Sequence, residues 1–390
     1  MLAPTPYFAD RGCHVRIFEE ARALIRQGHA VRIVTYHLGR DLPPVPVDRI
    51  PAVPWYRKLA AGPSWHKPYL DLLLLAKALR VARSFRPDLL HAHLHEGGFL
   101  GLLLKRILGV PLLFDCQGSM TTEMLDHGFF RAGSLLHRGF GFLEGVINRG
   151  ADFILTSSGP GAADLVERWG VPAAKVRALI DGVDTDEFRP GDRAAARQEL
   201  GLPLDVPVAV FLGVLNRYQG VDLLLEVVDL LRQRQVPLHF LVMGFPEEEY
   251  RRRAAEMGLA ERITFTGRVD YGRTPHLLAA GDLALSPKIS RTEANGKLFN
   301  YMACGLPTVA FDAPINREIL GDAGIYARFG DAGDFADRLV ELAADLPCRQ
   351  ELARRVREKA VAEHSWTARE KVLEDLYFRL LESASALGRC

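Results

Sequence analysis

The chain has 390 residues, of which 48% are hydrophobic and 25% charged, and its formal net charge is only +1 at pH 7. This length exceeds one ordinary hydrophobic core and predicts two domains of about 150 to 200 residues each. The balanced charge excludes the global basic field typical of nucleic-acid-binding proteins, so no nucleic acid partner is expected.

The spacing of the cysteines and the length of the apolar runs indicate the cellular compartment of the protein. The five cysteines are scattered and form no Cys-x-x-Cys pair, which fits reduced thiols in the cytosol. No apolar run approaches the roughly 20 residues of a membrane span, and the N-terminus lacks the pattern of a signal peptide. We therefore expect a cytoplasmic protein, with peripheral contact at the inner face of the membrane left open.

Short apolar runs alternate with longer helical patterns almost from end to end. Runs that are apolar on both faces and separated by helices predict parallel sheets covered on both sides. The expected fold class is α/β, with two doubly wound, Rossmann-like parallel sheets facing across a cleft. The expected strands are Ala30–Thr35, Leu89–Leu94, Leu112–Cys116, Phe153–Ser157, Val176–Ile180, Val208–Leu212, His239–Met243, Ile263–Thr266, Leu283–Ser286 and Thr308–Phe311.

An acidic stretch with a glycine and a terminal proline, Asp181–Pro190, separates the two halves and is typical of an interdomain hinge. We expect an N-terminal domain over residues 1–180, a hinge over 181–191, a C-terminal domain over 192–364 and a C-terminal segment over 365–390.

The first strand is brief, since only Leu2 and Ala3 precede a proline-rich stretch. A central strand normally has about five or six residues. Two interpretations remain open: the sequence begins a few residues late, from a misplaced start, or the strand is simply short.

Gly12 stands at the start of a helical pattern whose Phe18, Ala21 and Leu24 share one face. A glycine at this place permits close approach by a substrate or tight packing. Its position after a strand puts the two interpretations on even terms, because open parallel sheets bind ligands beyond the carboxyl ends of their strands.

Aromatic and basic side chains interleave in Trp55–Tyr69, which contains Arg57, Lys58 and Lys67. Such a stretch suits an interfacial membrane contact. The alternative is an ordinary surface loop followed by a packed, leucine-rich helix over Leu70–Ala82.

Three histidines at period two, His91, His93 and His95, share one face if the chain is extended. Three imidazoles can ligate zinc. The metal interpretation is disfavoured, because the alternation holds only while the strand lasts and His95 is expected in the loop. His93 is the best candidate for a polar substrate contact, with a hydrogen-bonded structural histidine as the alternative.

Two further loops follow apolar strands. Gln117 and Gly118 open a polar loop in which the glutamine can hydrogen-bond a sugar-like ligand. In the second half, Gly213–Gly220 precedes an amphipathic helix over Val221–Gln235. Its Arg217 can pair with a diphosphate that Gly213 admits to the backbone; a solvated arginine is the alternative.

The stretch Ser286–Pro307 passes from a polar loop into a helix expected to begin at about Asn295. The unpaired N–H groups of a helix start suit an anion. Gly296 lets a ligand approach the backbone, and Lys297 adds a charge suited to phosphate. The alternative is a surface loop with a solvated lysine and an N-cap asparagine.

In their order and spacing, these stretches resemble the retaining glycosyltransferases of the GT-B type, specifically family 4, the glycosyl transferases of group 1. The resemblance covers essentially the whole chain. Its motifs are the Gly12 loop, Pro87–His93, Gly182–Pro190, Gly213–Gly220, Phe265–Val269, Met302–Pro307 and Ser365-Trp366.

The resemblance implies a nucleotide sugar on the second domain, an acceptor largely on the first, and neither a metal nor a cofactor. It implies that Gly12 admits the transferred sugar and that the donor diphosphate lies near Arg217 and Lys297. Front-face transfer with retained configuration needs stabilisation of the departing diphosphate more than a strong protein base. The resemblance also implies that a helix over Trp366–Leu387 crosses back to the first domain.

The chain departs from the family pattern in three places. In the usual Gly-Arg-Leu-x-x-x-Lys-Gly motif neither cation is retained, and Arg217 is the compensating candidate. Thr292 and Asn300 replace the usual acidic pair, so Glu293, one place away, becomes the candidate for contacting the transferred sugar. Gln117 stands where a histidine is frequent, and a glutamine orients a hydroxyl but cannot take its proton.

The expected function is metal-independent, retaining transfer of a hexosyl unit from a nucleotide diphosphate sugar to a hydroxyl acceptor on a glycan, a lipid or a small molecule. The first rival is a catalytically weak nucleotide-sugar-binding or scaffold protein of the same fold, and the second is a sugar-nucleotide epimerase or a phosphorylase. The expected site residues are Gly12, His93 and Glu293 for catalysis, Gly213, Arg217, Gly296, Lys297, Leu298 and Asn300 for the donor, and Asp10, Gln117 and Gly118 for the acceptor.

Overall fold

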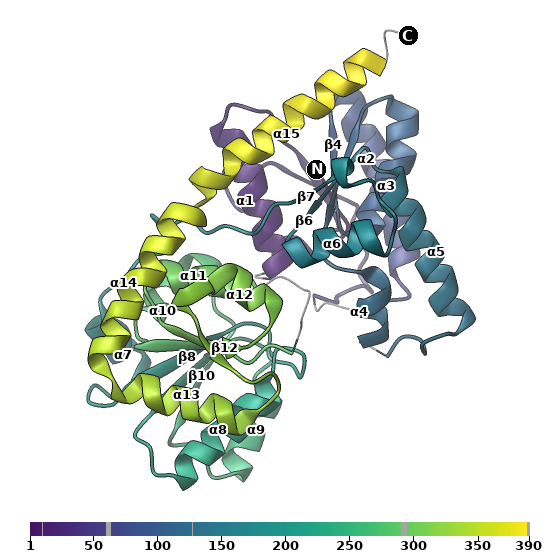
Figure 1. Cartoon of the computed structure of the whole chain (residues 1–390). Coiled ribbons are helices and arrows are strands. Elements are labelled where there is room, and N and C mark those ends of the chain that lie inside the picture. Colours follow the sequence, from purple (N-terminus) through teal and green to yellow (C-terminus); the bar gives the residue numbers. More distant parts are fainter. Residues whose placement is uncertain (10, 60–63, 127, 290–294, 388–390) are drawn as a thin grey trace. The chain divides into compact units, whose positions relative to one another are not determined.

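The computed structural model describes the whole chain except residues 10, 60–63, 127, 290–294 and 388–390. The chain forms two compact units (Figure 1). Unit 1 comprises Met1–Ile180 together with Arg369–Cys390, and unit 2 comprises Asp181–Ala368. Each unit is a parallel sheet covered by helices, which is the fold class that the alternating pattern predicts.

Unit 1 contains a seven-stranded sheet in the order β3-β2-β1-β4-β5-β6-β7, and its strand pairs are parallel. Its strands are β1 (Leu2–Ala3), β2 (Ile33–Thr35), β3 (Val47–Arg49), β4 (Leu90–His93), β5 (Leu112–Cys116), β6 (Phe153–Thr156) and β7 (Val176–Ala178).

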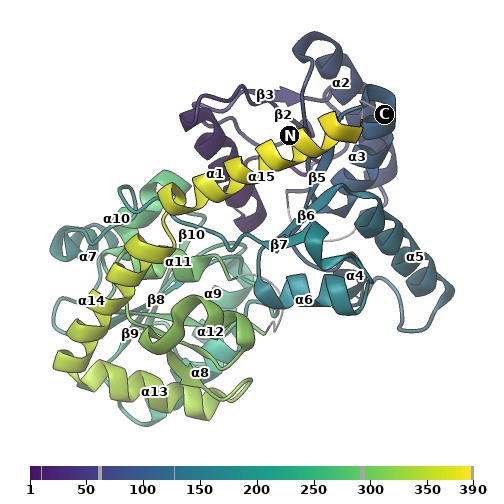
Figure 2. The same cartoon turned by 45° about the horizontal axis from the view of Figure 1, so that its top comes forward.

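Helices cover both faces of this sheet (Figures 1 and 2). On one face α2, α3 and α5 enclose a core with the strands, and on the other face α1 and α15 do so. The helices are α1 (Gly12–Arg26), α2 (Lys67–Phe85), α3 (Leu94–Leu108), α4 (Met120–Asp126), α5 (Leu135–Gly150), α6 (Gly159–Glu167), a 3-10 turn η1 (Ala173–Lys175) and α15 (Trp366–Leu387), of which residues 369 onward belong to unit 1.

Unit 2 contains a six-stranded parallel sheet in the order β10-β9-β8-β11-β12-β13. Its strands are β8 (Val208–Leu212), β9 (His239–Met243), β10 (Ile263–Gly267), β11 (Leu283–Ser286), β12 (Thr308–Phe311) and β13 (Ile325–Ala327). Its helices are α7 (Arg193–Leu200), α8 (Val221–Gln233), α9 (Glu248–Glu256), α10 (Thr274–Leu278), α11 (Lys297–Ala303), α12 (Pro314–Leu320), α13 (Ala332–Ala344) and α14 (Leu346–Glu363), with 3-10 turns η2 (Tyr271–Arg273) and η3 (Gly321–Ala323).

The expected strands are all present, and five of them have the expected bounds. Two strands were not predicted: β3 and β13. Both have three residues and are mostly half-buried at a sheet edge, so they lack the continuous apolar run of a central strand. The expectation that His95 lies in a loop is wrong, because α3 begins at Leu94, directly after β4.

Each sheet has a switch point, where the order of the strands reverses. From one of the two neighbouring strands the chain continues to one side of the sheet, and from the other it continues to the opposite side. In unit 1 this point lies between β1 and β4, and in unit 2 between β8 and β11. Loops that leave the carboxyl ends of such strands diverge and open a crevice, where ligands bind in doubly wound folds. The loops after β8 and β11 contain Gly213–Gly220 and the start of Ser286–Pro307.

Within the described parts of the chain, every helix is too short or too polar to cross a membrane.

Candidate functional site

In unit 2 the loops after β8 and β11 are held together backbone to backbone. The N–H of Ile289 donates to the carbonyl of Tyr218 at 3.0 Å. A Cβ atom on Gly220 would lie 1.9 Å from the carbonyl oxygen of Pro287, and the φ of Gly220 is +78°. Only glycine fits at this position, so the two loops form one surface at the switch point of the sheet.

Lys297 is the first residue of α11, and its ammonium group lies against the loop after β8. Its Nζ donates to Oε1 of Gln219 at 2.7 Å and lies 4.3 Å from the ring centroid of Phe211. A Cβ atom on Gly213 would lie 3.2 Å from the same Nζ. The structure thus places Gly213 and Lys297 side by side, so an anion at this point would meet both a positive charge and an accessible backbone.

Among the described residues of these loops, two other cations accompany Lys297. Arg217 is exposed in the loop after β8. Lys288 is buried, with Nζ 5.5 Å from the ring centroid of Tyr218, and the sequence reasoning missed it. The sequence did hold an indication of Lys288, because it lies two residues beyond β11, in one of the loops that leave the switch point.

The start of α11 differs from expectation. The helix begins at Lys297, and Asn295 does not cap it with its side chain. Instead, Nδ2 of Asn295 donates to Oγ of Ser286 at 2.9 Å and to Oδ1 of Asn316 at 2.8 Å. The asparagine is buried, and its Oδ1 accepts no hydrogen bond from the start of the helix, so the N-cap alternative is wrong.

The remaining donor candidates differ in exposure. Leu298 is fully buried, so only its backbone can face a ligand, whereas Asn300 is half-buried. Gly296 precedes the helix, where an added Cβ would have its nearest neighbour at 3.9 Å. Glu293, the candidate for contacting the sugar, lies outside the described residues.

In unit 1, a buried carboxylate at the end of β5 organises the neighbouring side chains. Asp115 accepts hydrogen bonds from Nε and Nη2 of Arg16 at 2.9 and 2.8 Å, and from Nε2 of Gln117 at 2.8 Å. Nδ1 of His93 donates to the same carboxylate at 3.1 Å. Burial alone would raise the pKa of Asp115, but the Arg16 guanidinium and the His93 hydrogen bond lower it well below its usual range.

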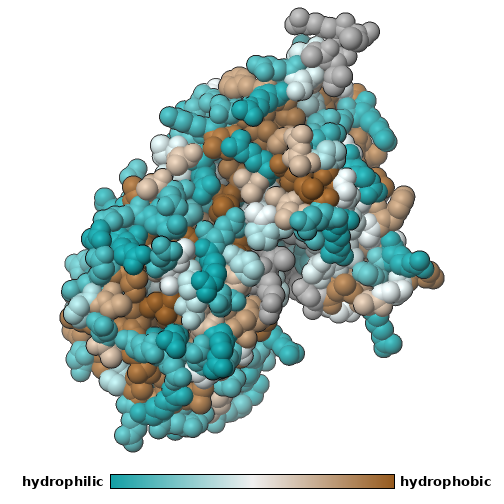
Figure 3. Space-filling view, viewed as in Figure 1, coloured by the Kyte–Doolittle hydropathy of each residue, from teal (hydrophilic) through white to brown (hydrophobic). Residues whose placement is uncertain are grey.

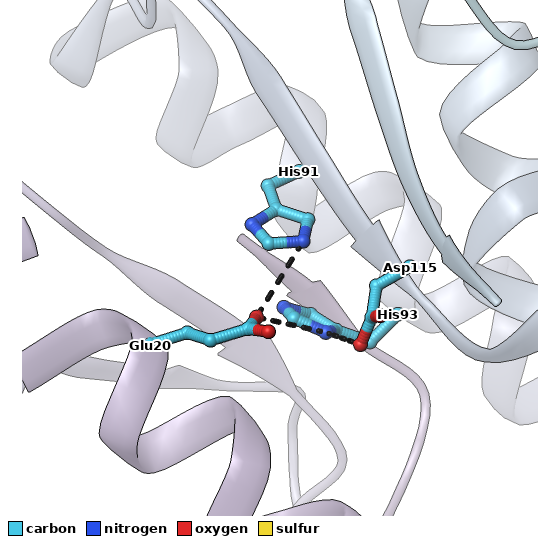
Figure 4. A group of neighbouring side chains, drawn as sticks. All are labelled: Glu20, His91, His93 and Asp115. Atoms are coloured by element: carbon cyan, nitrogen blue, oxygen red, sulfur yellow. Dashed lines mark hydrogen bonds and ion pairs between the residues drawn. The ribbon is translucent and has the colours of Figure 1, made fainter. Parts of the chain in front are cut away.

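Figure 4 shows Asp115 and His93 in one group with His91 and Glu20. Nε2 of His91 lies 3.6 Å and Nδ1 of His93 lies 3.9 Å from Oε2 of Glu20. The centroids of the two imidazole rings lie 4.2 Å apart, and the rings are tilted by 33°. Four such ligand atoms can hold a metal ion. Here Nη2 of Arg16 already lies 3.1 Å from Glu20 and 2.8 Å from Asp115, so the guanidinium supplies positive charge to both carboxylates.

The three histidines do not form one set. His91 shares a hydrogen bond of 2.7 Å with the hydroxyl of Tyr377, whereas His95 turns away to lie 3.6 Å from Glu144. Burial lowers the pKa of His91, His93 and His95. His93 is fully buried and bonded to Asp115, a geometry that favours the structural alternative over direct substrate contact.

Of the acceptor candidates that the structure describes, Gln117 is half-buried and Gly118 is exposed. Gln117 directs its amide N–H to Asp115, which leaves its Oε1 to accept a hydrogen bond from a hydroxyl group. A methyl group on Gly118, or on the catalytic candidate Gly12, would meet no atom of the described residues within 4 Å. Asp10 lies outside the described residues.

The sequence reasoning missed Arg16, Glu20 and Asp115. Their signal was present, since Asp115 interrupts an apolar strand and the two other residues lie one turn apart in a helix. Partners that lie 99 residues apart, as Arg16 and Asp115 do, cannot be paired from spacing alone.

Comparisons with known proteins fit this geometry. The family described as "Glycosyl transferase 4-like domain" matches residues 11–182, and "Glycosyl transferases group 1" matches residues 206–345. D-inositol 3-phosphate glycosyltransferase 2 of Catenulispora acidiphila is 30% identical, over 96% of this chain and 92% of that protein.

Two solved structures share the fold. Sucrose-phosphate synthase from Thermosynechococcus elongatus superposes with a TM-score of 0.82 at 20% identity, covering 98% of each chain. Anabaena Alr3699/HepE in complex with UDP-glucose gives a TM-score of 0.75 at 19% identity, covering 99% of each chain.

Proposed function

Because the chain belongs to the glycosyl transferases of group 1 and is a glycosyltransferase of the GT-B fold, we propose that it is a metal-independent, retaining enzyme. It moves a hexosyl unit from a nucleotide diphosphate sugar to a hydroxyl group. A cytoplasmic location belongs to the same proposal.

The observation that carries the donor site is the contact between Lys297 and the loop after β8. The ammonium group lies beside Gly213 and is held by Gln219, at the switch point of the unit 2 sheet. A diphosphate bound here would meet the ammonium group and the backbone of a glycine. The exposed Arg217 and the buried Lys288, in the same pair of loops, add positive charge there.

In the proposed reaction the bond between the anomeric carbon and the diphosphate oxygen breaks, and a bond to the acceptor oxygen forms on the same face of the sugar. The departing diphosphate takes the acceptor proton, and Lys297 stabilises the negative charge that develops on it. This route fits the residues of unit 1, because Gln117 can orient a hydroxyl through Oε1 but cannot accept its proton as a base.

The names of related proteins set the first substrates to test. UDP-glucose is bound in the Anabaena structure, and the Catenulispora relative is named for D-inositol 3-phosphate. We therefore place a UDP-sugar first among donors and a hydroxyl of an inositol phosphate first among acceptors. Glycans and lipids remain the next acceptor classes, because the Oε1 atom of Gln117 can accept a hydrogen bond from a hydroxyl of any of them.

The test compares the wild type with Lys297→Ala and Lys297→Arg across a panel of UDP-, GDP- and ADP-sugars. Removal of the ammonium group is expected to lower kcat/KM for the preferred donor by about a hundredfold, by analogy with loss of one charge-stabilising group. Arginine is expected to restore part of the activity. Lys175→Ala, at an exposed lysine of unit 1, is the matched control. Unchanged donor affinity and turnover in Lys297→Ala would remove this residue from the site.

Product analysis separates the rivals. A catalytically weak binding or scaffold protein, the reading favoured by Thr292 and Asn300 in place of the acidic pair, binds the donor without transferring the sugar. An epimerase leaves the diphosphate attached to the sugar, and a phosphorylase requires free phosphate. Transfer with inverted anomeric configuration would contradict the retaining mechanism, and loss of activity with a chelator would contradict metal independence.

A further inference from the structure

The outer surface of α2, α3 and α5 in unit 1, here the α2–α3–α5 surface, exposes large apolar side chains. Scattered single hydrophobic residues are normal on a protein surface, but here neighbouring helices of one layer each expose at least one. The exposed fractions are 67% for Leu72, 40% for Phe99, 61% for Ile107, 85% for Leu135, 72% for Phe142 and 37% for Val146.

The exposed charges on these three helices have one sign. Each carboxylate of the helices is held inside or at a partner: Asp71 accepts from Tyr36, Glu96 is paired with Lys67, and Glu144 is buried against Thr121. Among the described residues of α2, α3 and α5, no exposed carboxylate therefore offsets the arginines. The exposed basic residues are Arg80, Arg83, Arg106, Arg138 and Arg149.

The pattern is sharpest along α5. Leu135, Arg138, Phe142, Val146 and Arg149 follow one another at intervals of three or four residues, so they lie on one face of the helix. Its opposite face is buried in the unit 1 core. The exposed face combines apolar and basic side chains, the composition of a helix that lies in a membrane interface.

Trp65, from the aromatic and basic stretch Trp55–Tyr69, is also exposed in unit 1. Trp65 is 81% exposed, and its ring lies 5.2 Å from that of Phe129. Phe129 in turn lies 6.2 Å from Phe140 of α5. Trp65 is thus linked to α5 through Phe129 and Phe140, and exposed indole rings are favoured at the headgroup level of a bilayer. Figure 3 shows hydrophobic side chains beside hydrophilic ones along the edge of unit 1 where α5 lies.

We propose that the α2–α3–α5 surface binds an anionic lipid bilayer, with α5 parallel to the membrane plane. Leu135 and Phe142 enter the boundary between headgroups and acyl chains, while the arginines meet lipid phosphates. A nucleic acid would use the arginines but leave the apolar side chains in water. The proposal is independent of the transferase reaction and assigns no acceptor.

The test measures co-sedimentation of the full chain with phosphatidylcholine vesicles and with vesicles containing about 30% phosphatidylglycerol, a lipid that supplies negative surface potential. The wild type is expected to bind the anionic vesicles and to dissociate as salt is raised. Leu135→Ser combined with Phe142→Ser is expected to weaken binding by at least about tenfold, because the apolar insertion is lost. Arg138→Glu is expected to weaken it by about fivefold or more.

Matched controls lie in unit 2. Leu204 is 69% exposed, and Arg252 is exposed on α9. Arg252→Glu makes the same change of charge as Arg138→Glu, and Leu204→Ser removes one exposed apolar side chain, both away from the α2–α3–α5 surface. The substituted positions are exposed, so thermal unfolding is expected to match the wild type. Absence of binding to anionic vesicles at low salt would overturn the proposal, as would equal binding by the α5 variants and the controls. If the protein transfers sugar but does not bind anionic vesicles, the membrane proposal is overturned and the proposed transferase function is not.

Discussion

Glycine positions distinguish packing from ligand access in this protein. Gly220 is required by the fold, because a side chain there would collide with the backbone of Pro287. Gly12 is different, since it is exposed and a methyl group on it would meet no protein atom within 4 Å. From the sequence, tight packing and close approach by a substrate explained Gly12 equally well. Among the described residues, the structure shows no side chain or backbone that packs against it.

Gly12→Ala therefore separates function from stability. Gly12 is the first residue of α1, and alanine is the better helix former, so the unfolding free energy is expected to stay constant or to rise by up to about 1 kcal/mol. If the transferred sugar occupies the open space, kcat/KM falls by roughly tenfold to a hundredfold. Steady-state kinetics and thermal unfolding measure the two effects. Gly141→Ala, in an equally open helical position, is the control; full activity of Gly12→Ala would exclude the close approach.

Among the site residues, the sequence predicted those neighbours whose proximity follows from the order of the strands. Gly213 and Lys297 both follow strands, and both strands flank the switch point, so their proximity follows from the parallel topology. The bond of Asp115 to Arg16 could not be predicted. It depends on how far α1 is rotated about its axis above the sheet, which hydrophobic periodicity sets only roughly.

At the scale of elements, α15 shows how a late segment completes an early sheet. Leu373, Leu376 and Leu380 are buried in one cluster with Leu24 of α1 and strand residues of unit 1. The helical spacing of these leucines was visible in the sequence. The surface that receives them was not, because it is assembled from β5, β6, the chain that follows β7, and α1, all far away along the chain.

Leu373→Ala tests the contribution of this packing. Leu373 is fully buried, so its truncation is expected to lower the unfolding free energy by about 2 to 4 kcal/mol through lost burial and the resulting cavity. Urea unfolding followed by circular dichroism measures the change. Lys371→Ala, at an exposed position of the same helix, is expected to change stability by less than about 0.5 kcal/mol. Equal effects of the two substitutions would show that α15 adds little to the core.

At the scale of the whole molecule, buried histidines make stability depend on pH. Burial lowers the pKa of His91, His93 and His95 in the folded protein, so below about pH 6.5 the unfolded chain binds more protons than the folded one. Stability is therefore present at neutral pH and lost as the pH falls. Asp115 acts in the same direction at lower pH, because its pKa is lowered and its protonation breaks the pairing with Arg16.

The unfolding free energy is expected to fall by about 1 kcal/mol per histidine for each pH unit below about 6.5. Denaturant unfolding at several pH values between about 7.5 and 5.5 measures the slope. His91→Gln is expected to reduce this slope by the contribution of one histidine. His66→Gln, at an exposed position, serves as the control. A slope that is the same in wild type and His91→Gln would contradict the assignment.

The chain passes between its two units twice, once near residue 180 and once near residue 368. Unit 2 is consequently an uninterrupted insertion within unit 1, whose last helix is made only after the whole insertion has been synthesised. A single gene fragment can encode unit 2 in full, but no uninterrupted fragment encodes unit 1. One proteolytic cut between the units leaves them joined by the second connection, and complete separation needs two cuts.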